Sequence, residues 1–516
     1  MHPSTAIPLK LRFKLDVLGG PRERETLTEI VFSASVFILP LLTYLLTLSP
    51  TVYALDSAEL TIAATTGGLM RATGYPLYLL LGRIWSLIPF GDMGFRMNLF
   101  SAVCGALGVW IGYRIMRRLG AGRLAAAGAA GLMAAAPIYW SLSLIAEVYT
   151  LQVVLMGIQI VLLLRWADNP TALNLSLVAG WIGLSLGHHL ATVLLVPGAV
   201  LFVNGRAGRR IFLPGNLLGS AAAFLAGISI YLYLPLLYAA DPVFNYAGLF
   251  DDQLVFHPVD LQSVSGMWWL VTGRAFASRM FAYQGAAFLH EALFYAGSLG
   301  RAFLFIGILP GLIGLWALLR RDRLLAGMLL LMFGLSAYFF IDYAVVDKET
   351  MFLPTYLVWA IFAGVGYQTL EDRAPAGRGR AVLHGAILGT VLIAAAVTGP
   401  AVDLSGNRAP REAAERILVS VEPEAVIFGW WETIPPIQYL QLVEGQRPDV
   451  EIVNRFLVPR KSMYLFVQRE IDRRPIYIDV FPEEWTFVFK PVPAGRLFRL
   501  ERIVHPDRTG VRIGGY

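Results

Sequence analysis

Residues 76–89 read PLYLLLGRIWSLIP, and whether this stretch crosses a membrane decides the topology of the whole chain. Its fourteen residues are too few to cross comfortably, because a spanning helix needs about 20 mostly apolar residues. Arg83 and Trp85 stand near its middle. The pattern therefore favours a helix that lies in the membrane interface.

Longer apolar runs surround this stretch. The chain has 516 residues, of which 56% are hydrophobic and 15% charged, whereas soluble domains carry about 25% charged residues. We therefore expect an all-α polytopic membrane protein with about eleven transmembrane helices. The candidate spans are 30–48, 98–116, 124–140, 148–165, 172–188, 190–204, 212–236, 302–319, 324–341, 351–369 and 381–400.

Clusters of arginine between the apolar runs set the direction of insertion. They are Arg114/Arg117/Arg118/Arg123, Arg206/Arg209/Arg210, Arg320/Arg321/Arg323 and Arg373/Arg378/Arg380. If 76–89 does not cross, all four clusters face the cytoplasm, as the positive-inside rule requires. The clusters also account for the net charge of +6, so we expect membrane lipid and no nucleic acid as a partner.

This topology divides the chain into three parts. Residues 1–29 form a cytoplasmic N-terminal segment, and residues 30–400 form the spanning region with outer loops at 49–97 and 239–301. Residues 401–516 lie outside, where short β-rich runs alternate with helix-like stretches, which predicts a small extracytoplasmic α/β domain. No G-x-G-x-x-G follows these strands, so a dinucleotide site there is unsupported.

The first outer loop contains the best candidates for chemistry. Residues 49–82 read SPTVYALDSAELTIAATTGGLMRATGYPLYLLLG, and Asp56 and Glu59 share one face if this part is helical. Asp-Ser-Ala-Glu also fits a capping box, in which Asp56 caps a helix and Glu59 bonds back to the cap amide. Local sequence alone favours this structural role, although a cap would also hold a carboxylate at a fixed place beside the membrane.

The wider pattern resembles a known family. An acidic motif after the first span, a Gly-Tyr-Pro turn, an interfacial helix and a span ending in Arg-Arg-Leu-Gly resemble the GT-C superfamily of polyprenyl-phosphosugar-dependent glycosyltransferases. More narrowly, they resemble the transmembrane protein 260 type of protein O-mannosyltransferase, of the family once called domain of unknown function 2723. Further similar stretches are AEVYTLQ (146–152), GLSLGHHLATVLLVP (183–197), VTGRAFASRMF (271–281), VVDKETMFLPTYL (345–357) and GQRPDVEIVN (445–454).

The resemblance implies an inverting glycosyltransferase on the extracytoplasmic face. It would move a sugar, mannose by analogy, from a polyprenyl-phosphate donor to a hydroxyl of a protein, such as Ser or Thr, or of a glycan. Such transfer needs a base for the acceptor proton and cations for the departing phosphate. Asp56 matches the family's base, and Glu59 orients it, binds the acceptor or completes the cap. A divalent metal between the two carboxylates stays open.

Candidate residues for the phosphate and the cavity come from the same family-like stretches. We rank Arg274, Arg279 and Lys348 first, followed by His188 and His189. Because adjacent residues of a helix point in different directions, only one of the two histidines can readily face a site. The other candidates are Arg71, Tyr75, Glu147 and Tyr149. At Gly429-Trp430-Trp431-Glu432 the chain departs from the Gly-Asp that relatives often carry, so the resemblance assigns that turn no role.

Two other classes of function stay open. One is a multi-span transporter or lipid flippase, although such carriers usually keep ionisable residues near mid-bilayer and the candidate spans here carry theirs at their ends. The other is a non-catalytic membrane assembly protein. The Ala/Gly/Arg-rich composition suggests a prokaryotic plasma membrane.

Overall fold

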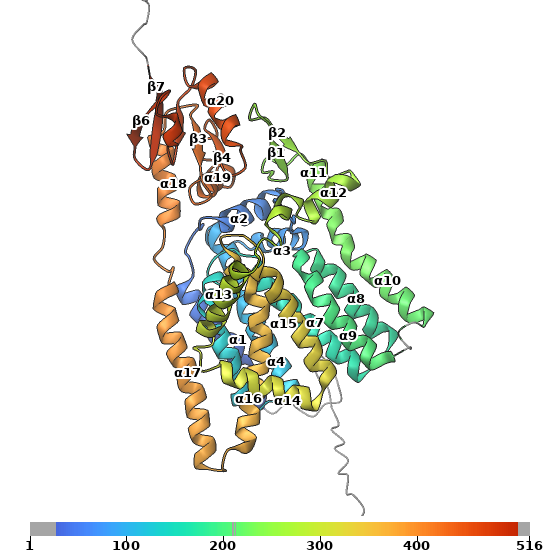
Figure 1. Cartoon of the computed structure of the whole chain (residues 1–516). Coiled ribbons are helices and arrows are strands. Elements are labelled where there is room, and N and C mark those ends of the chain that lie inside the picture. Colours follow the sequence, from blue (N-terminus) through green and yellow to red (C-terminus); the bar gives the residue numbers. More distant parts are fainter. Residues whose placement is uncertain (1–26, 209–210, 212, 504–516) are drawn as a thin grey trace, which may run out of the picture.

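The computed structural model describes residues 27–208, 211 and 213–503, so most of the expected 1–29 segment lies outside the described residues. A bundle of long helices carries a small domain at one end, with α2 and α3 lying between them (Figure 1). The bundle helices are α1 (Leu27–Thr47), α4 (Met93–Arg118), α5 (Arg123–Ala134), α6 (Pro137–Leu142), α7 (Tyr149–Asp168), α8 (Ala172–Leu186), η1 (Leu190–Leu195), α9 (Val196–Ala207), α10 (Pro214–Ile228), η3 (Ser229–Leu232), α11 (Tyr233–Ala239), α14 (Ile308–Arg321), α15 (Arg323–Ile341), η5 (Lys348–Phe352), α16 (Leu353–Arg373) and α17 (Arg378–Val402).

The expected spans coincide with these helices. Eight helices of the described chain are long and apolar enough to cross a membrane: Leu27–Thr47, Met93–Arg118, Tyr149–Asp168, Leu190–Ala207, Pro214–Ala239, Arg323–Ile341, Lys348–Arg373 and Arg378–Val402. The other three expected spans fall on the shorter helices α5, α8 and α14. The prediction of an all-α polytopic membrane protein is therefore confirmed.

Burial separates the helices that face lipid from those inside the bundle. Only 11% of the apolar window of α1 and 17% of that of α17 is buried, against 89% for α16. Small residues let α16 and its neighbours pack closely, since a Cβ on Gly366 would lie 1.8 Å from the carbonyl oxygen of Pro310. Likewise, a Cβ on Gly128 of α5 would lie 2.1 Å from the side chain of Ile387 in α17.

The arginine clusters gather at the end of the bundle away from the small domain, where a loop joins α16 to α17 (Figure 1). Arg117 and Arg123 both pair with Glu29. Arg321 donates to the carbonyl of Leu119, and Arg206 pairs with Asp322. Arg209 and Arg210 lie outside the described residues. This common end agrees with the inferred topology, and its cytoplasmic location stays a prediction.

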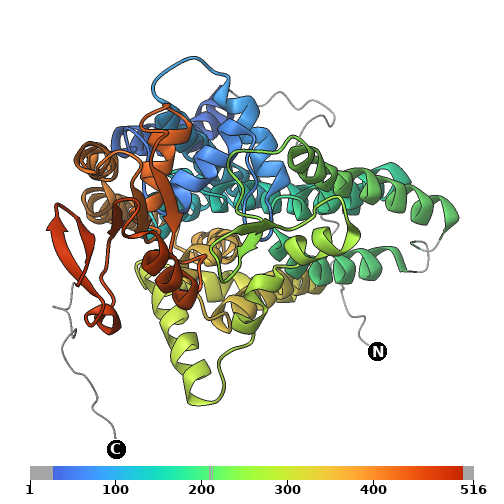
Figure 2. The ribbon, with the colours of Figure 1, turned by 90° about the horizontal axis from the view of Figure 1, so that it is seen from above.

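The outer loops form short elements at the opposite end. Loop one contains α2 (Asp56–Thr66) and α3 (Pro76–Ser86), and α3 is too short to be a span. The second outer loop contains β1 (Gly248–Phe250), β2 (Phe256–Pro258), α12 (Val264–Val271), η4 (Arg274–Arg279) and α13 (Ala286–Ala302). Seen from above, parts of this second loop cross the middle of the bundle beside the C-terminal domain (Figure 2).

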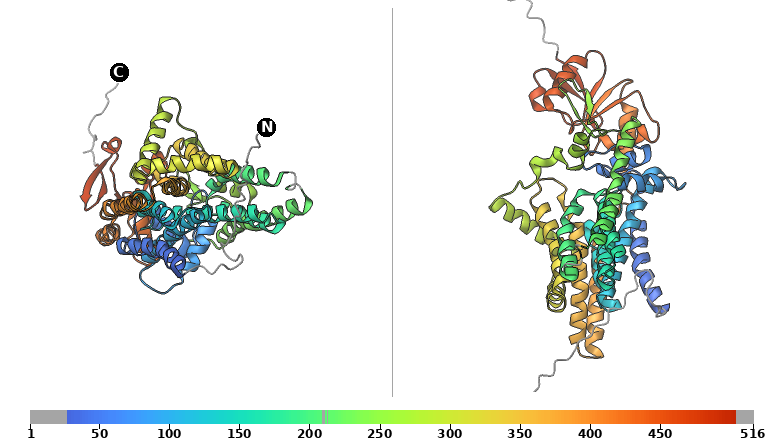
Figure 3. Two further views of the ribbon diagram at one scale, coloured as in Figure 1. Left: turned by 90° about the horizontal axis from the view of Figure 1, so that it is seen from below. Right: turned by 90° about the vertical axis from the view of Figure 1, so that its right-hand side faces the viewer.

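The C-terminal domain is α/β, as expected. Its five-stranded sheet has the order β4-β3-β5-β7-β6, with β3 parallel to β4 and β5, and β7 antiparallel to β5 and β6. Its elements are α18 (Ala409–Ser420), β3 (Val426–Gly429), α19 (Ile434–Leu442), β4 (Glu451–Asn454), α20 (Arg460–Glu470), β5 (Ile476–Ile478), η6 (Glu483–Trp485), β6 (Phe489–Ala494) and β7 (Leu497–Arg502). A side view shows this domain standing on one end of the bundle (Figure 3).

The domain is fixed to the first outer loop. Helix α19 packs against α2, and the amide of Gly94 donates a hydrogen bond to the hydroxyl of Tyr439 at 3.1 Å. Arg411 pairs with Glu444 at 2.6 Å and also approaches Asp92 at 3.8 Å. These contacts place the carboxyl end of β3 over the loop that carries Asp56 and Glu59.

Candidate functional site

Helix α2 does not begin with the capping box that its sequence suggested. Leu55 occupies the N-cap with φ 60°, and Asp56 is the first helical residue. No side chain makes the cap hydrogen bond. The capping interpretation is therefore wrong, because both carboxylates are engaged by a residue that local sequence does not bring near.

That residue is Arg71. Its Nη2 lies 2.6 Å from both carboxylate oxygens of Asp56, and its Nη1 bonds to Oε2 of Glu59. Charge-assisted bonds of this kind are stronger than neutral ones and fix the geometry of both partners. Arg71 therefore holds the two carboxylates in one arrangement at the outer end of the bundle.

The Gly-Tyr-Pro turn explains how the chain brings Arg71 back to α2. Gly74 has φ +81°, and a Cβ there would lie 2.9 Å from the side chain of Leu234. Tyr75 follows in the left-handed region with φ 46° as the N-cap of α3, and Pro76 takes the first helical position, where its fixed φ suits a helix start. The segment between α2 and α3 is thereby folded tightly against the bundle, with Arg71 near its centre.

Asp56 and Glu59 differ in their access to solvent. The side chain of Glu59 is fully buried, whereas that of Asp56 is 31% exposed. Burial raises the pKa of Glu59 to about 8, with Asp56 adding to the shift and Arg71 opposing it. Asp56 is thus the carboxylate that a substrate can reach, and Glu59 is a buried group behind it.

This buried group predicts a pH dependence of stability. Between its ordinary pKa of 4.5 and about 8, folded Glu59 keeps a proton that the unfolded chain releases, so rising pH favours unfolding. We expect the Tm of the purified protein in detergent to fall from pH 5 to pH 8 more steeply than the Tm of Glu59→Gln. Parallel profiles for the two proteins would contradict the assignment.

Trp431 of the C-terminal domain covers this cluster. Its ring lies 4.2 Å from the guanidinium carbon of Arg71, at cation–π distance. Within the described chain, its indole Nε1 and Oε1 of Glu59 are both buried, and neither makes a hydrogen bond of normal geometry. The turn after β3, to which the resemblance assigned no role, therefore contributes a side chain to the site.

Removing the ring of Trp431 from Arg71 should slow any reaction that depends on Arg71. A cation–π contact contributes about 0.5–2 kcal/mol, so we expect Trp431→Ala to lower kcat/KM about tenfold and Trp431→Phe to lower it less. Trp430→Ala is the matched control, because Trp430 faces Arg455 instead. Equal effects of Trp431→Ala and Trp430→Ala would show that the domain acts only through its folding.

Several of the other candidates line the same region. The ring of Tyr75 lies 5.7 Å from that of His189, which lies 6.3 Å from that of Tyr149. Burial raises the pKa of Glu147, and the charges of Asp56 and Asp347 raise it further. Two predicted residues, Tyr75 and Glu147, thus interact electrostatically with Asp56, and the rings of His189 and Tyr149 lie beside Tyr75 in turn.

The two histidines have different surroundings. His189 accepts a hydrogen bond from the amide of Ala191 through Nδ1, and burial lowers its pKa to about 4. His188 is fully buried, with Nε2 bonded to the carbonyl of Val148 at 2.8 Å. His189 therefore contacts the aromatic residues near Asp56, while His188 ties two helix ends together.

The three predicted phosphate-binding cations differ in their burial and in their partners. Lys348 is buried, pairs with Glu291 at 2.5 Å and donates to the carbonyl of Ile341, so its charge is already balanced. Arg274 is exposed at the start of η4. Arg279, at the end of η4, approaches the ring of Phe456 at 5.7 Å and affects the pKa of Tyr343, as Arg71 also does. Arg279 thus lies nearer the Asp56 region than its sequence position suggests.

Metal binding was left open by the sequence. Among residues 27–208, 211 and 213–503, no group of three or more His, Cys, Asp and Glu side chains is arranged to hold a metal ion. Asp56 and Glu59 supply two carboxylates, and both contact Arg71.

Sequence reasoning missed two residues of the site. Trp431 and Tyr246 lie on segments remote from loop one, yet Tyr246 interacts electrostatically with both Glu59 and Arg71. One signal was available for Trp431, since it lies two residues after the buried strand β3, and ligands of open α/β sheets gather at the carboxyl ends of strands. No comparable pattern marks Tyr246.

The part of the chain that carries Asp56, Glu59 and Arg71 is similar in sequence to known proteins. Residues 56–209 match the family model described as the protein O-mannosyl-transferase TMEM260 N-terminal domain, which confirms the family resemblance over that segment. Protein O-mannosyl-transferase TMEM260 of Mus musculus is 30% identical over 209 residues, which are 39% of this chain and 30% of the mouse protein. The chain therefore matches less than a third of the length of this relative.

Solved structures share the fold. The crystal structure of ArnT from Cupriavidus metallidurans bound to undecaprenyl phosphate aligns with a TM-score of 0.57 and 14% identity, covering 91% of this chain and 97% of that chain. The apo state of the same protein gives a TM-score of 0.54 with the same identity and coverage. The expected GT-C-like fold is therefore confirmed.

Proposed function

We propose that this protein is an inverting glycosyltransferase that moves a sugar, with mannose as the candidate, from a polyprenyl phosphate to a hydroxyl acceptor outside the cytoplasm. The observation that carries the proposal is the partly exposed Asp56 carboxylate, held by Arg71 at the outer end of the bundle. Asp56, Glu59 and Arg71 all fall within the segment similar to the O-mannosyltransferase family.

The proposed chemistry needs one base. The acceptor hydroxyl attacks the anomeric carbon of the sugar from the face opposite the phosphate, and its proton passes to Asp56. The bond between the anomeric carbon and the phosphate oxygen breaks, and the lipid phosphate leaves as an anion, which requires no general acid. Glu59 and Arg71 set the position of Asp56.

Cations must stabilise the departing phosphate. Arg71 is shared between two carboxylates and Lys348 is paired with Glu291, so neither is the first choice. Arg279 and Arg274 on η4 are better suited, because η4 lies in the outer loop beside the bundle and Arg279 is close to Tyr343. We propose these two arginines as the phosphate contacts.

The setting of the proposed reaction is the outer face of a prokaryotic plasma membrane. The lumenal face of the endoplasmic reticulum would preserve the same topology. Transport is less well supported, since the charged clusters described above lie at the two ends of the bundle, whereas coupled carriers keep ionisable groups near mid-bilayer.

The test is a transfer assay with the purified full chain in lipid nanodiscs. Mannosyl polyprenyl phosphate and a short peptide containing Ser and Thr serve as substrates, and mass spectrometry detects a hexose on the peptide. We expect product with this donor and none with a nucleotide sugar. Movement of the labelled donor between the leaflets of a vesicle, without a covalent product, would instead support a flippase.

A further inference from the structure

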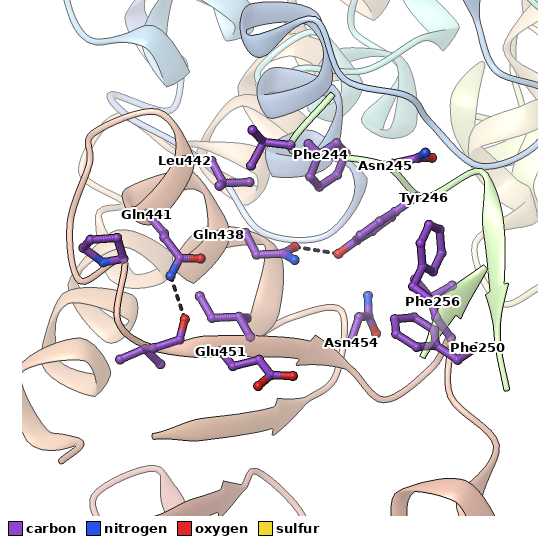
Figure 4. A pocket seen from close by; sticks show the side chains of 15 residues that line it. Phe244, Asn245, Tyr246, Phe250, Phe256, Gln438, Gln441, Leu442, Glu451 and Asn454 are labelled. Atoms are coloured by element: carbon purple, nitrogen blue, oxygen red, sulfur yellow. Dashed lines mark hydrogen bonds between the residues drawn. The ribbon is translucent and has the colours of Figure 1, made fainter. Parts of the chain in front are cut away.

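A cavity of about 480 Å³ lies between the second outer loop and the C-terminal domain (Figure 4). Side-chain amides and aromatic rings from both segments line it, among them Asn245, Phe250, Phe256, Gln438, Gln441 and Asn454. Of the described residues that line it, Glu451 alone is charged, and that carboxylate pairs with Arg474. The cavity thus suits an uncharged ligand with many hydrogen-bonding groups.

One wall of the cavity is the edge strand β4. This strand ends the sheet and pairs with β3 on one side only. The amide of Glu451 donates to the carbonyl of Ala425, and that of Arg455 donates to the carbonyl of Gly429. Because amides alternate in direction along a strand, those of Ile452 and Asn454 point away from β3. Within the described chain, neither of these two amides has an acceptor. The edge therefore offers free donors toward the cavity.

The opposite edge of the same sheet is built differently. Strand β6 carries Pro491 and Pro493, which lack an amide hydrogen, whereas β4 reads EIVN and has no proline. Proline on an edge strand is a common means of preventing pairing with another chain. One edge of this sheet is therefore protected, and the edge that faces the cavity is not.

A buried polar group also points to a missing ligand. Asn454 is 3% exposed, and within the described chain its Nδ2 makes no hydrogen bond of normal geometry, although the phenol of Tyr246 lies close enough to interact with this side chain. Next to it, the hydroxyl of Tyr246 donates to Oε1 of Gln438 at 2.5 Å, as Figure 4 shows. Buried amides are rarely left unpaired, because each lost hydrogen bond has a free-energy cost.

Tyr246 links the cavity to the site around Asp56, because it lines the cavity and interacts with Glu59 and Arg71. The amide of Tyr246 donates to the carbonyl of Leu69, and the amide of Leu69 donates to the carbonyl of Phe244. This pairing places Tyr246 beside Leu69, which lies two residues before Arg71 in the chain, and the charges of Glu59 and Arg71 both act on its phenol. A ligand in the cavity would therefore reach toward the proposed base.

We propose that this cavity binds an extended polypeptide, which pairs with the edge of β4 and presents a hydroxyl side chain toward Asp56. The inference rests on the proposed glycosyl transfer and names where its acceptor binds. An extended peptide uses the backbone donors of Ile452 and Asn454, and its alternate side chains meet the amides and rings of the walls. A free glycan would leave the backbone edge unused.

The experiment measures direct binding of a probe to the full-length protein in detergent. The probe is a fluorescent peptide of alternating Val and Thr with Lys at both ends, and its counterpart carries N-methyl groups on the Thr amides. We expect the parent peptide to bind about tenfold more tightly, because N-methylation removes the hydrogen bonds of strand pairing. Equal binding of the two peptides would overturn the proposal, as would displacement of the peptide by a mannose oligosaccharide.

Two variants locate the binding edge. Ile452→Pro removes the outward amide at a position that proline tolerates on an edge strand, and Ile452→Ala trims the side chain but keeps the amide. We expect about tenfold weaker peptide binding for Ile452→Pro and a smaller change for Ile452→Ala. The same loss in both variants, with unchanged Tm, would assign binding to the side chain and refute strand pairing.

The two proposals can fail separately. Peptide binding to β4 without any transfer of sugar would leave the binding site standing and refute the glycosyltransferase. Conversely, transfer to the peptide that is unaffected by N-methylation and by Ile452→Pro would support the enzyme and refute this acceptor site.

Discussion

Asp56→Asn removes the general base of the proposed mechanism, and we expect kcat to fall about 10²–10⁴-fold, the usual contribution of such a base. Asparagine has nearly the same shape but cannot accept the acceptor's proton at neutral pH. One oxygen still accepts a bond from Arg71, so the fold around α2 should persist. The measurement is kcat in nanodiscs with saturating donor and peptide, beside the Tm of the same preparation.

The matched control for this substitution is Asp472→Asn. Asp472 is an aspartate of the C-terminal domain that is 65% exposed and pairs with Arg502. Surface pairs of this kind contribute little to stability, so we expect unchanged transfer and Tm. Full activity in Asp56→Asn would remove Asp56 from the chemistry, and a lowered Tm in that variant would indicate a structural role instead.

The spans were predictable because their signal is local. Apolar runs about 20 residues long and arginines at their ends can be counted in the sequence without knowing any tertiary contact. The short stretch 76–89 forms α3, a helix of eleven residues, and excluding it brought all the arginine clusters to one end. The α/β tail followed in the same local manner from short β-rich runs that alternate with helix-like stretches.

The site was only partly predictable because its contacts are not local. Asp56 and Glu59 were found from their spacing, but the same spacing suggested a capping box that the structure does not form. Both carboxylates instead pair with Arg71, 15 residues along the chain from Asp56. The Gly-Tyr-Pro turn was noticed as a motif, and its φ values show why it brings Arg71 to the carboxylates.

The sequence could indicate the turn after β3 in the C-terminal domain, but it could not choose between the two tryptophans of that turn. Trp431 meets Arg71 across some 360 positions of chain, through the packing of α19 on α2. Interfacial tryptophans are common in membrane proteins, so a Trp-Trp pair in a tail gives no reason to choose one over the other. Only the fold separates Trp431, which covers Arg71, from Trp430, which faces Arg455.

Arg71→Met should be the most destabilising single change in the site. It leaves the fully buried Glu59 and the neighbouring Asp56 without their cation, and above the pKa of Glu59, at about 8, where the buried pair is charged, breaking it costs about 3–5 kcal/mol. The double variant Arg71→Met/Glu59→Gln removes the buried charge as well, so we expect it to regain much of the lost Tm without regaining transfer.

The pH dependence of Tm distinguishes the loss of the cation beside Glu59 from a simple packing defect. In Arg71→Met, Glu59 avoids being a buried unpaired charge if it stays protonated. The free-energy cost of keeping that proton grows as pH rises above the ordinary pKa of 4.5. The Tm of the double variant should therefore exceed that of Arg71→Met by little at pH 5 and by more at pH 8. A gap that does not change with pH would mean that Arg71 stabilises the site by packing under Trp431 and not by neutralising Glu59.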